Sequence, residues 1–370
     1  MVDSLHLAYR RTDRLAAALD AWDRGIAAEG PATLHRWTNL AIWPAARSAT
    51  VAGSTGIEGN PLTADEVQEI LGGGTVDARA ADIRDVRNYN AALDVANRAA
   101  LRPDFEWTQE LLRRLNAQVT EGLEADERGE YRTGPVTVGG IYHPPDHLAL
   151  PALMADLVTW LRSATDQHAL IRAGLAHLNV VSIHPWRDGN GRTSRVVGSL
   201  MLMRHGVSAP ELVNVESTIR SDPTAYVAAL QAAHGPSYQP DRHAATPWLE
   251  YFAELSVDRL DLRTRLEAAI EGDIGLISME LDRAGEPASW IAVTFAATGG
   301  PVRTSRVAET LGLSAPRARA LLAEAAAAGW LVPEGERRGR RHRAGPRLEA
   351  LRLRTPDLLD RLRHGRPVEG

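Results

Sequence analysis

A short polar segment, HPWRDGNGRTSR at residues 184–195, gathers side chains that could act on a phosphate group. Histidine, here His184, is the side chain best suited to taking a proton near neutral pH. Asp188 offers a carboxylate, and Mg²⁺ prefers such oxygen ligands. The Gly-Asn-Gly triplet at 189–191 lets successive backbone amides face one point where a helix begins, which makes an anion nest.

Two arginines follow the nest. Arg192 and Arg195 are three residues apart in the expected helix, so their guanidinium groups share a face and can bind successive phosphates. Each feature has an ordinary reading by itself: a structural histidine, a turn, a surface salt bridge. Their concentration in one segment favours a site for a nucleotide tail.

The composition excludes several other chemistries. The chain has no cysteine, so it can have no disulfide, thiolate metal site or cysteine nucleophile. All 42 of its basic residues are arginine. A Walker phosphate loop, a protein kinase and a Schiff-base enzyme each need a lysine, and all three are excluded. Phosphate must be bound by arginine, backbone amides or metal.

The length of 370 residues predicts two or three domains. We expect an N-terminal helical region at 1–100, a catalytic core with trailing helices at 101–285, a third domain at 286–346 and a basic tail at 347–370. No run of apolar residues is long enough to span a membrane, and the N-terminus lacks a signal-peptide pattern. The sequence therefore predicts a soluble, cytoplasmic protein.

Helical spacing of apolar residues dominates the chain, as in residues 82–96 and 150–162. Residues 131–145 are different, because Val136, Val138 and Ile141 alternate around two glycines. This pattern predicts a small β-hairpin, whose glycines would allow close approach of another backbone. An ordinary surface hairpin is the alternative.

The C-terminal pattern is helix, turn, helix and β-ribbon. Residues 302–313 and 315–328 predict two helices with Ser314 capping the second, and 329–345 predict a strand, a turn and a strand. That order is typical of a winged helix-turn-helix. Residues 301–370 hold 15 arginines against 8 acidic residues.

DNA binding is one hypothesis for this domain, and a protein-docking module is the other. The arginines that would contact DNA phosphates lie on the second helix and the wing: Arg317, Arg319, Arg337, Arg338, Arg340, Arg341 and Arg343.

The segment at 184–195 resembles the signature of the Fic family, HPFx[D/E]GNGRxxR. Only Trp186 departs from it, where the family usually has phenylalanine, and we expect that ring to be a buried anchor. The similarity extends over roughly residues 47–252 and includes NYNAAL, the YRTGPVTVGG hairpin and TPWLEYF.

The resemblance implies a helical bundle and a transfer of AMP from ATP to a Ser, Thr or Tyr hydroxyl of a target protein. It makes His184 the catalytic base and Asp188 the ligand of Mg²⁺. It further assigns two groups of residues. Catalysis and nucleotide binding would use Gly189, Asn190, Gly191, Arg192 and Arg195. Docking of the target would use a flap formed by Val136, Thr137, Val138, Gly139 and Gly140.

A second motif lies far upstream. The stretch from Ser54 to Glu58 is similar to [S/T]xxxE[G/N], the inhibitory motif of Fic proteins whose brake precedes the core. Without the resemblance it would be a capped helix end. Ser54 and Glu58 are four apart and share a helix face, so we expect Glu58 to form a bidentate pair with Arg195 and deny it to the γ-phosphate.

The sequence thus predicts a mainly α protein: a Fic bundle with a hairpin flap and a C-terminal winged helix. The predicted function is an autoinhibited protein adenylyltransferase using ATP and Mg²⁺. The alternatives are removal of AMP, another nucleotide-dependent transfer, or a DNA-binding regulator with a nucleotide-sensing core. The resemblance also leaves room for a homodimer.

Overall fold

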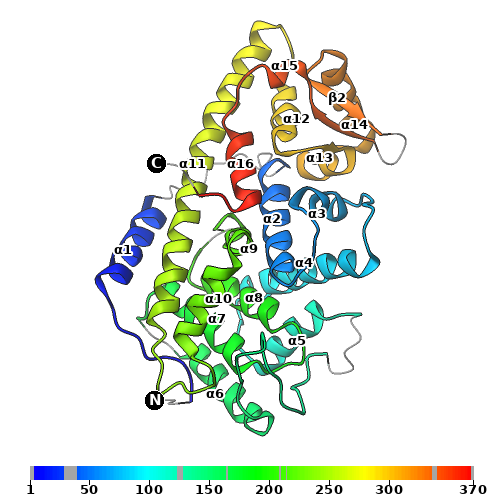
Figure 1. Cartoon of the computed structure of the whole chain (residues 1–370). Helices are drawn as coiled ribbons and strands as arrows, with labels where there is room; N and C mark the ends of the chain where they lie inside the picture. The colour runs from blue at the N-terminus through cyan, green and yellow to red at the C-terminus, as the bar shows by residue number, and fades with distance from the viewer. Residues whose placement is uncertain are drawn as a thin grey trace.

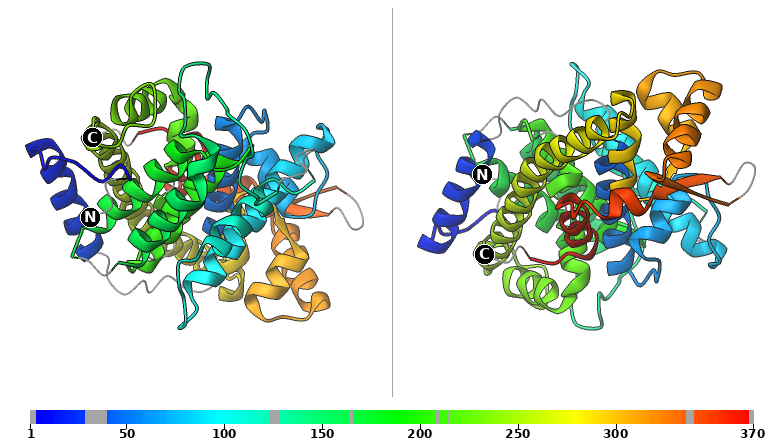
Figure 2. Two further views of the ribbon diagram at one scale, coloured as in Figure 1. Left: turned by 90° about the horizontal axis from the view of Figure 1, so that it is seen from below. Right: turned by 90° about the horizontal axis from the view of Figure 1, so that it is seen from above.

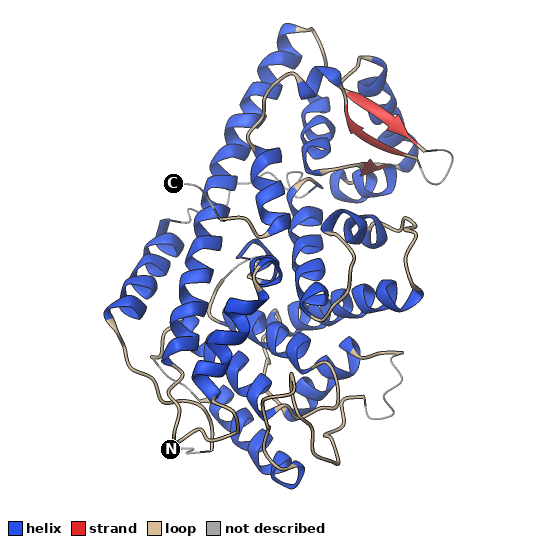
Figure 3. Ribbon diagram, viewed as in Figure 1, coloured by secondary structure: helices blue, strands red, loops and turns tan. Residues whose placement is uncertain are grey.

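The structure is a computed structural model that describes residues 4–28, 40–122, 128–163, 166–207, 210–213, 215–335 and 340–367. Helices make up nearly all of its regular structure (Figures 1 and 3), which confirms the mainly α class. The α-helices are α1 (Asp13–Ala28), α2 (Ile42–Ile57), α3 (Ala64–Leu71), α4 (Ala80–Ala100), α5 (Gln109–Val119), α6 (Leu150–Arg162), α7 (Ala169–Ile183), α8 (Asn190–Arg204), α9 (Glu216–Ser221), α10 (Pro223–His234), α11 (Thr246–Arg283), α12 (Ile291–Ala296), α13 (Thr304–Leu311), α14 (Ala315–Ala327), α15 (Pro346–Glu349) and α16 (Thr355–His364).

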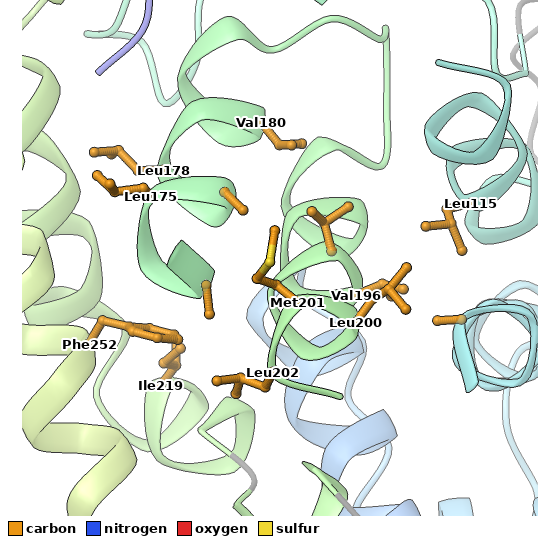
Figure 4. Close-up of a cluster of buried hydrophobic side chains, with 14 of the residues drawn as sticks. Leu115, Leu175, Leu178, Val180, Val196, Leu200, Met201, Leu202, Ile219 and Phe252 are labelled. Carbon is orange, nitrogen blue, oxygen red and sulfur yellow. The ribbon is translucent and has the colours of Figure 1, made fainter. Parts of the chain in front are cut away.

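The centre of the larger core is the pair α7 and α8, joined by the loop at 184–189. Helix α7 is buried on every side except at Ala169 and Val181, as expected for a helix enclosed by others. Leucines and valines of the two helices lie in one buried cluster with Met201 of α8, Leu115 of α5 and Phe252 of α11 (Figure 4). This rigid pair fixes the positions of the two ends of the polar segment.

Helix α11 connects the two parts of the molecule. It has 38 residues and is therefore about 57 Å long. It runs from the lower bundle to the upper C-terminal end, with α1 alongside it (Figures 1 and 2). Among the described residues, no helix has both the length and the apolar content needed to cross a bilayer.

The C-terminal module, as we call α12 to α16 with their strands, is built on a second core. Strands β1 (Val302–Arg303), β2 (Leu331–Glu334) and β3 (Arg341–Ala344) form an antiparallel sheet of order β1-β3-β2. Val302 pairs with His342, and Leu331 pairs with Ala344. The expected helix, helix and β-ribbon order is present.

Two details of this module differ from the expectation. The first helix begins at Thr304 because Val302 and Arg303 pair with β3 as a strand. The tail is not merely basic: its α16 buries Leu358, Leu359 and Leu362 in the second core. Ser314 does cap α14, accepting a hydrogen bond from the backbone N–H of Arg317.

Helix α2 belongs to both cores. Its first half, from Ile42 to Ala49, packs in the second core, and Val51 and Ala52 pack in the first. The helix lies between the bundle and the C-terminal module in Figure 1. Its last turn carries Ser54, and Glu58 is its C-cap residue.

Candidate active site

His184 lies where α7 ends and has a left-handed backbone conformation, with φ 50°. Such a conformation strains a side chain larger than glycine and is typical of functional positions. Nδ1 of the ring is 3.2 Å from the carbonyl oxygen of Val181. A carbonyl only accepts, so Nδ1 carries the proton and Nε2 keeps its lone pair.

Burial lowers the pKa of His184 to about 4 from the ordinary 6.5. A desolvated imidazole disfavours the charged form. The ring is therefore neutral near pH 7 and can accept a proton at Nε2.

The loop after His184 is held by Trp186 and Asn190. The side-chain oxygen of Asn190 accepts from the backbone N–H of Trp186 over 3.0 Å, and its Nδ2 donates to the carbonyl of Trp186 over 2.8 Å. The indole of Trp186 is buried, as expected for an anchor, and donates to the carbonyl of Gly129. Asn190 was expected to hold phosphate, but its side-chain oxygen and nitrogen both hydrogen bond to the backbone of Trp186.

Gly189 begins α8 with φ 77° and no side chain caps that end. A Cβ at Gly189 would lie 2.8 Å from Cγ2 of Thr120, so the position has no room for a side chain. The first backbone N–H groups of a helix have no partner within the helix and attract anions. The beginning of α8 therefore has uncapped backbone N–H groups at the position of the predicted anion nest.

Arg192 is buried and is not open to solvent as a free phosphate ligand. It pairs with the carboxylates of Asp85 and Asp188, the latter at 3.2 Å. Asp188 also accepts from the backbone N–H of Gly189 over 2.6 Å. Burial raises the pKa of Asp85, against the opposing charge of Arg192. Sequence reasoning missed Asp85, because nothing in α4 indicates a partner 107 residues away.

Arg195 connects the polar segment to the upstream motif. Its Nη2 donates to Oε1 of Glu58 over 2.8 Å, and its Nε donates to the hydroxyl of Ser54 over 2.7 Å. Nη2 also donates to the backbone carbonyl of Ser54 over 3.0 Å. The pairing with Glu58 is therefore a single hydrogen bond, not the expected bidentate one, because Ser54 takes the other edge of the guanidinium.

Glu58 also fills space beside the nest. A Cβ placed on Gly191 would come within 2.4 Å of Oε1 of Glu58. The acid therefore sits directly against the first turn of α8 and against Arg195. In this arrangement a carboxylate lies beside the first backbone N–H groups of α8 and hydrogen bonds to Arg195.

Buried polar residues of α7, α9 and α10 lie near Arg195. Tyr226 hydrogen bonds to Nε2 of His177 at 3.0 Å, and burial lowers the pKa of His177 to about 3. Burial likewise raises the pKa of Glu216 to about 7. Despite the opposing effect of burial, Glu58 and the neighbouring tyrosines raise the pKa of Arg195. The guanidinium remains charged.

The segment at 131–145 forms the expected small hairpin, in which a tight turn joins two short paired stretches. It has one antiparallel bridge, between Val138 and Tyr142. Gly139 and Gly140 both have positive φ, 57° and 73°, and a Cβ on either would meet no atom within 4 Å. Ile141 is 56% exposed at the tip.

Arg132 hydrogen bonds both to the flap at 131–145 and to the loop at 184–189. Its side chain donates to the carbonyl oxygens of His184 and Gly134, each over 2.9 Å, and to that of Pro145 over 2.5 Å. Its own backbone N–H donates to Pro185. Burial lowers the pKa of Arg132. Sequence reasoning missed this residue, although its position just before the flap was a usable signal.

The described residues contain no group of three or more His, Asp or Glu side chains that could hold a metal ion. The carboxylate of Asp188 is 51% exposed. Mg²⁺ often takes one protein carboxylate and completes its shell with phosphate oxygens and water. Asp188 could supply one protein ligand of this kind.

Part of the chain is similar in sequence to proteins of one known family. Residues 106–202 match the Fic/DOC family. The chain is 34% identical over 204 residues to the protein adenylyltransferase Fic of Drosophila willistoni, covering 52% of this chain and 39% of that protein. It is 29% identical over 258 residues to the protein of the same name in Aedes aegypti, covering 68% and 49%. The chain thus spans two fifths to half of these relatives.

Solved structures share the fold. A Fic family protein from Desulfovibrio desulfuricans superposes with a TM-score of 0.60 at 24% identity, covering 92% of this chain and 98% of that one. Fic-1 from C. elegans superposes with a TM-score of 0.56 at 22% identity, covering 68% and 71%. The first comparison includes most of the C-terminal module as well as the bundle.

Proposed function

We propose that this chain, whose residues 106–202 match the Fic/DOC family, is a protein adenylyltransferase that moves AMP from ATP to a hydroxyl of a target protein. The observation that carries the proposal is the placing of a neutral His184 at the end of α7, beside the uncapped beginning of α8. The relatives named protein adenylyltransferase Fic support the same reaction.

In the proposed reaction, Nε2 of His184 takes the proton of a Ser, Thr or Tyr hydroxyl on the target. The hydroxyl oxygen attacks the α-phosphorus of ATP and forms a new P–O bond. The bond from the α-phosphorus to the bridging oxygen of the β-phosphate breaks, and pyrophosphate leaves with that oxygen. Backbone N–H groups at the beginning of α8 would stabilise the charge that develops on the α-phosphate.

The residues around the nest would bind the rest of the nucleotide. We assign Arg195 to the γ-phosphate and Arg192 to the β-phosphate, with Asp188 as the protein ligand of Mg²⁺. Mg²⁺ would neutralise phosphate charge when bound. Arg192 must then share its guanidinium between phosphate and the carboxylates of Asp85 and Asp188 that it contacts now.

The flap would present the target. Paired glycines at 139–140 and an exposed Ile141 suit a segment on which another chain can dock by backbone pairing. Because Arg132 bonds to both the flap and His184, the flap and the base would keep one mutual geometry. The docked hydroxyl would thereby be held in line with the α-phosphorus.

We further propose that Glu58 restrains this activity. Its carboxylate holds Arg195 and lies against Gly191, so the γ-phosphate of ATP would meet a like charge and lose its arginine. ATP could still bind in an unproductive pose. Support by Glu58 for a hydrolytic water, which would remove AMP, is the alternative role of the same residue.

DNA binding by the C-terminal module is less well supported. Several arginines expected to meet DNA have carboxylate partners within the chain: Arg317 with Glu324, Arg341 with Glu69 and Glu334, and Arg343 with Glu334 and Glu349. Arg337 and Arg338 lie outside the described residues. Charges already paired release few counterions on binding DNA, so we favour a role for this module within the chain.

The reaction class is tested by comparing two labels of ATP in the Glu58→Gly variant. AMP transfer puts the label of [α-³²P]ATP on protein and releases that of [γ-³²P]ATP as pyrophosphate. The variant should therefore label a lysate, or itself, only with the α-label, and adding His184→Ala should abolish the signal. Labelling by the γ-phosphate, or none by either label, would contradict the proposal.

A further inference from the structure

The helix that carries the brake is held at its other end by the C-terminal module. Ile42, Ala45 and Ala49 of α2 share a core with Phe295 and with leucines of α16. The contact includes the backbone, because a Cβ on Gly299 would come within 2.2 Å of the carbonyl oxygen of Ala41. Any shift of the module therefore acts on α2 directly.

Glu69 is the charged centre of this contact. It lies on α3, which packs against α2, and it accepts from Arg303 of β1 over 2.5 Å. Its other carboxylate oxygen accepts from Arg341 of β3. The side chain of Glu69 is 22% exposed and that of Arg303 17%. One half-buried acid thus holds two strands of the module.

Arg363 of α16 adds a second attachment. It donates to the carbonyl of Gly299 and to Oε1 of Gln68, the latter over 3.2 Å, and its Nε lies 3.6 Å from Asp65. Gln68 and Asp65 are on α3, beside Glu69. The module is therefore joined to the α2–α3 pair by polar contacts from its sheet and from its last helix.

A further route leads to the last turn of α2 through α9. A Cβ on Gly53 would lie 2.6 Å from the backbone nitrogen of Ser217, and a Cβ on Gly365 would lie 2.3 Å from the carbonyl oxygen of the same residue. Backbone contacts thus sandwich α9 between α2 and the end of α16. Gly53 immediately precedes Ser54, which binds Arg195.

The contact between the C-terminal module and the α2–α3 pair, which we call the seam, is not solidly packed. A cavity of about 930 Å³ lies along it, lined from one side by residues of α2, α3 and α4 and from the other by residues 299–309, Arg341 and Arg363. Polar contacts around a cavity can separate at lower cost than an interlocked apolar core. The polar contacts of the module with α3 surround this cavity, so they can separate more readily than the apolar contacts of the module with α2.

We propose that the C-terminal module clamps the brake helix α2 through Glu69, so that releasing the module releases Glu58 from Arg195. The proposal rests on the proposed restraint by Glu58 and adds the element that sets its strength. A partner that draws Arg303 and Arg341 away from Glu69 would activate transfer without touching the active site.

The test reverses the charge at the centre of the clamp. Glu69→Arg places three guanidinium groups together and should open the seam. With Glu58 intact, AMP transfer should rise about 5-fold or more, and amide hydrogen exchange in residues 50–58 should accelerate. Adding Glu58→Gly to Glu69→Arg should give no more activity than Glu58→Gly alone, since both changes act on one brake. Adding Arg303→Glu and Arg341→Glu should restore both readouts.

Glu271→Arg, an exposed charge reversal on α11, is the matched control and should change neither readout. If Glu69→Arg does not fold, Glu69→Gln keeps the shape, removes the charge and should give a smaller rise. The clamp would be overturned if the Glu69 variants transferred AMP and exchanged amide hydrogens at the wild-type rates while Glu58→Gly was active. An inactive Glu58→Gly would instead refute the proposed function, while hydrogen exchange would still report on the clamp.

Discussion

Arg195 holds Glu58 by one hydrogen bond of 2.8 Å, in a pair of unequal burial: the side chain of Arg195 is 1% exposed and that of Glu58 39%. Screening by solvent weakens a pair in which one partner is this exposed. The arginine stays fixed by Ser54 when the acid leaves, because its Nε donates to that hydroxyl. The geometry therefore combines a firmly held arginine with a more exposed carboxylate that could leave it.

Ser54→Ala should loosen the brake less than loss of the acid itself. It removes the hydroxyl that accepts from Nε of Arg195 and leaves a buried guanidinium N–H without a partner. Such a loss costs about 1–3 kcal/mol of stability. Urea unfolding should show that loss, and labelled-ATP assays should show a rise below that of Glu58→Gly.

Thr55→Ala is the control for Ser54→Ala. Thr55 is also buried, and among the described residues its hydroxyl donates to the carbonyl of Val51 within its own helix. It should leave AMP transfer unchanged. Equal activation by the two variants would show that helix damage, and not the contact with Arg195, releases the brake.

Arg132 should be needed for transfer although it touches no reacting atom. Arg132→Met leaves three carbonyl oxygens of the flap and catalytic loop without their donor. Misplacing the base and the flap should lower AMP transfer in the Glu58→Gly background by about 100-fold. Arg132→Lys should rescue little, because one ammonium cannot span the same three oxygens.

Exposed Arg128 provides the comparison for Arg132. Arg128→Met removes the same charge from the same region and should leave transfer unchanged. A fully active Arg132→Met variant would show that the flap holds its position without this residue.

On the acid side, the pH at which AMP transfer begins to fall should lie far below 6.5. Burial lowers the pKa of His184 to about 4, and a general base works only when unprotonated. In Glu58→Gly, kcat/KM should therefore stay flat on the acid side until the pH falls toward this pKa. An inflection near the ordinary value of 6.5 would mean that the ring is more solvated than the structure indicates.

Buried histidines should make the fold acid-sensitive. Burial lowers the pKa of His6 to about 3 and that of His177 to about 3, from the ordinary 6.5. Between pH 3 and pH 6.5 the unfolded chain binds protons at these histidines that the folded chain does not bind. The free energy of unfolding is therefore highest above pH 6.5 and falls as the pH drops toward 3. Each histidine contributes a slope of about 1.4 kcal/mol per pH unit.

His6→Phe isolates one of these contributions. Both ring nitrogens of His6 lack a hydrogen-bond partner among the described residues, and the ring stands edge-on to Tyr238 at 5.1 Å. Phenylalanine should fit there and reduce the slope by about 1.4 kcal/mol per pH unit. Urea titrations from pH 7 to pH 5 measure it, and an unchanged slope would contradict the assigned pKa.

Local patterns predicted the elements well. Helix α6 has the bounds that apolar spacing predicts, and Ser314 caps α14 as expected. The packing of Glu58 against Arg195 was predicted only with the help of a family resemblance, because the two residues are 137 positions apart.

Partner choices among arginines could not be predicted. Arg192 was expected to be free for phosphate but pairs with Asp85, and Arg341 was expected to meet DNA but pairs with Glu69. An arginine can reach many carboxylates, and only the tertiary arrangement decides which one lies within range. The same limit hid Arg132, whose acceptors are all backbone carbonyls.

The most direct measurement is the rate of label transfer from [α-³²P]ATP by wild type and by Glu58→Gly at equal protein concentration. Removing the carboxylate frees Arg195 and the space beside Gly191 while leaving Ser54 in place. We expect Glu58→Gly to transfer AMP at least about 10-fold faster than wild type, with unchanged thermal unfolding. Equal rates for the two proteins would contradict the account.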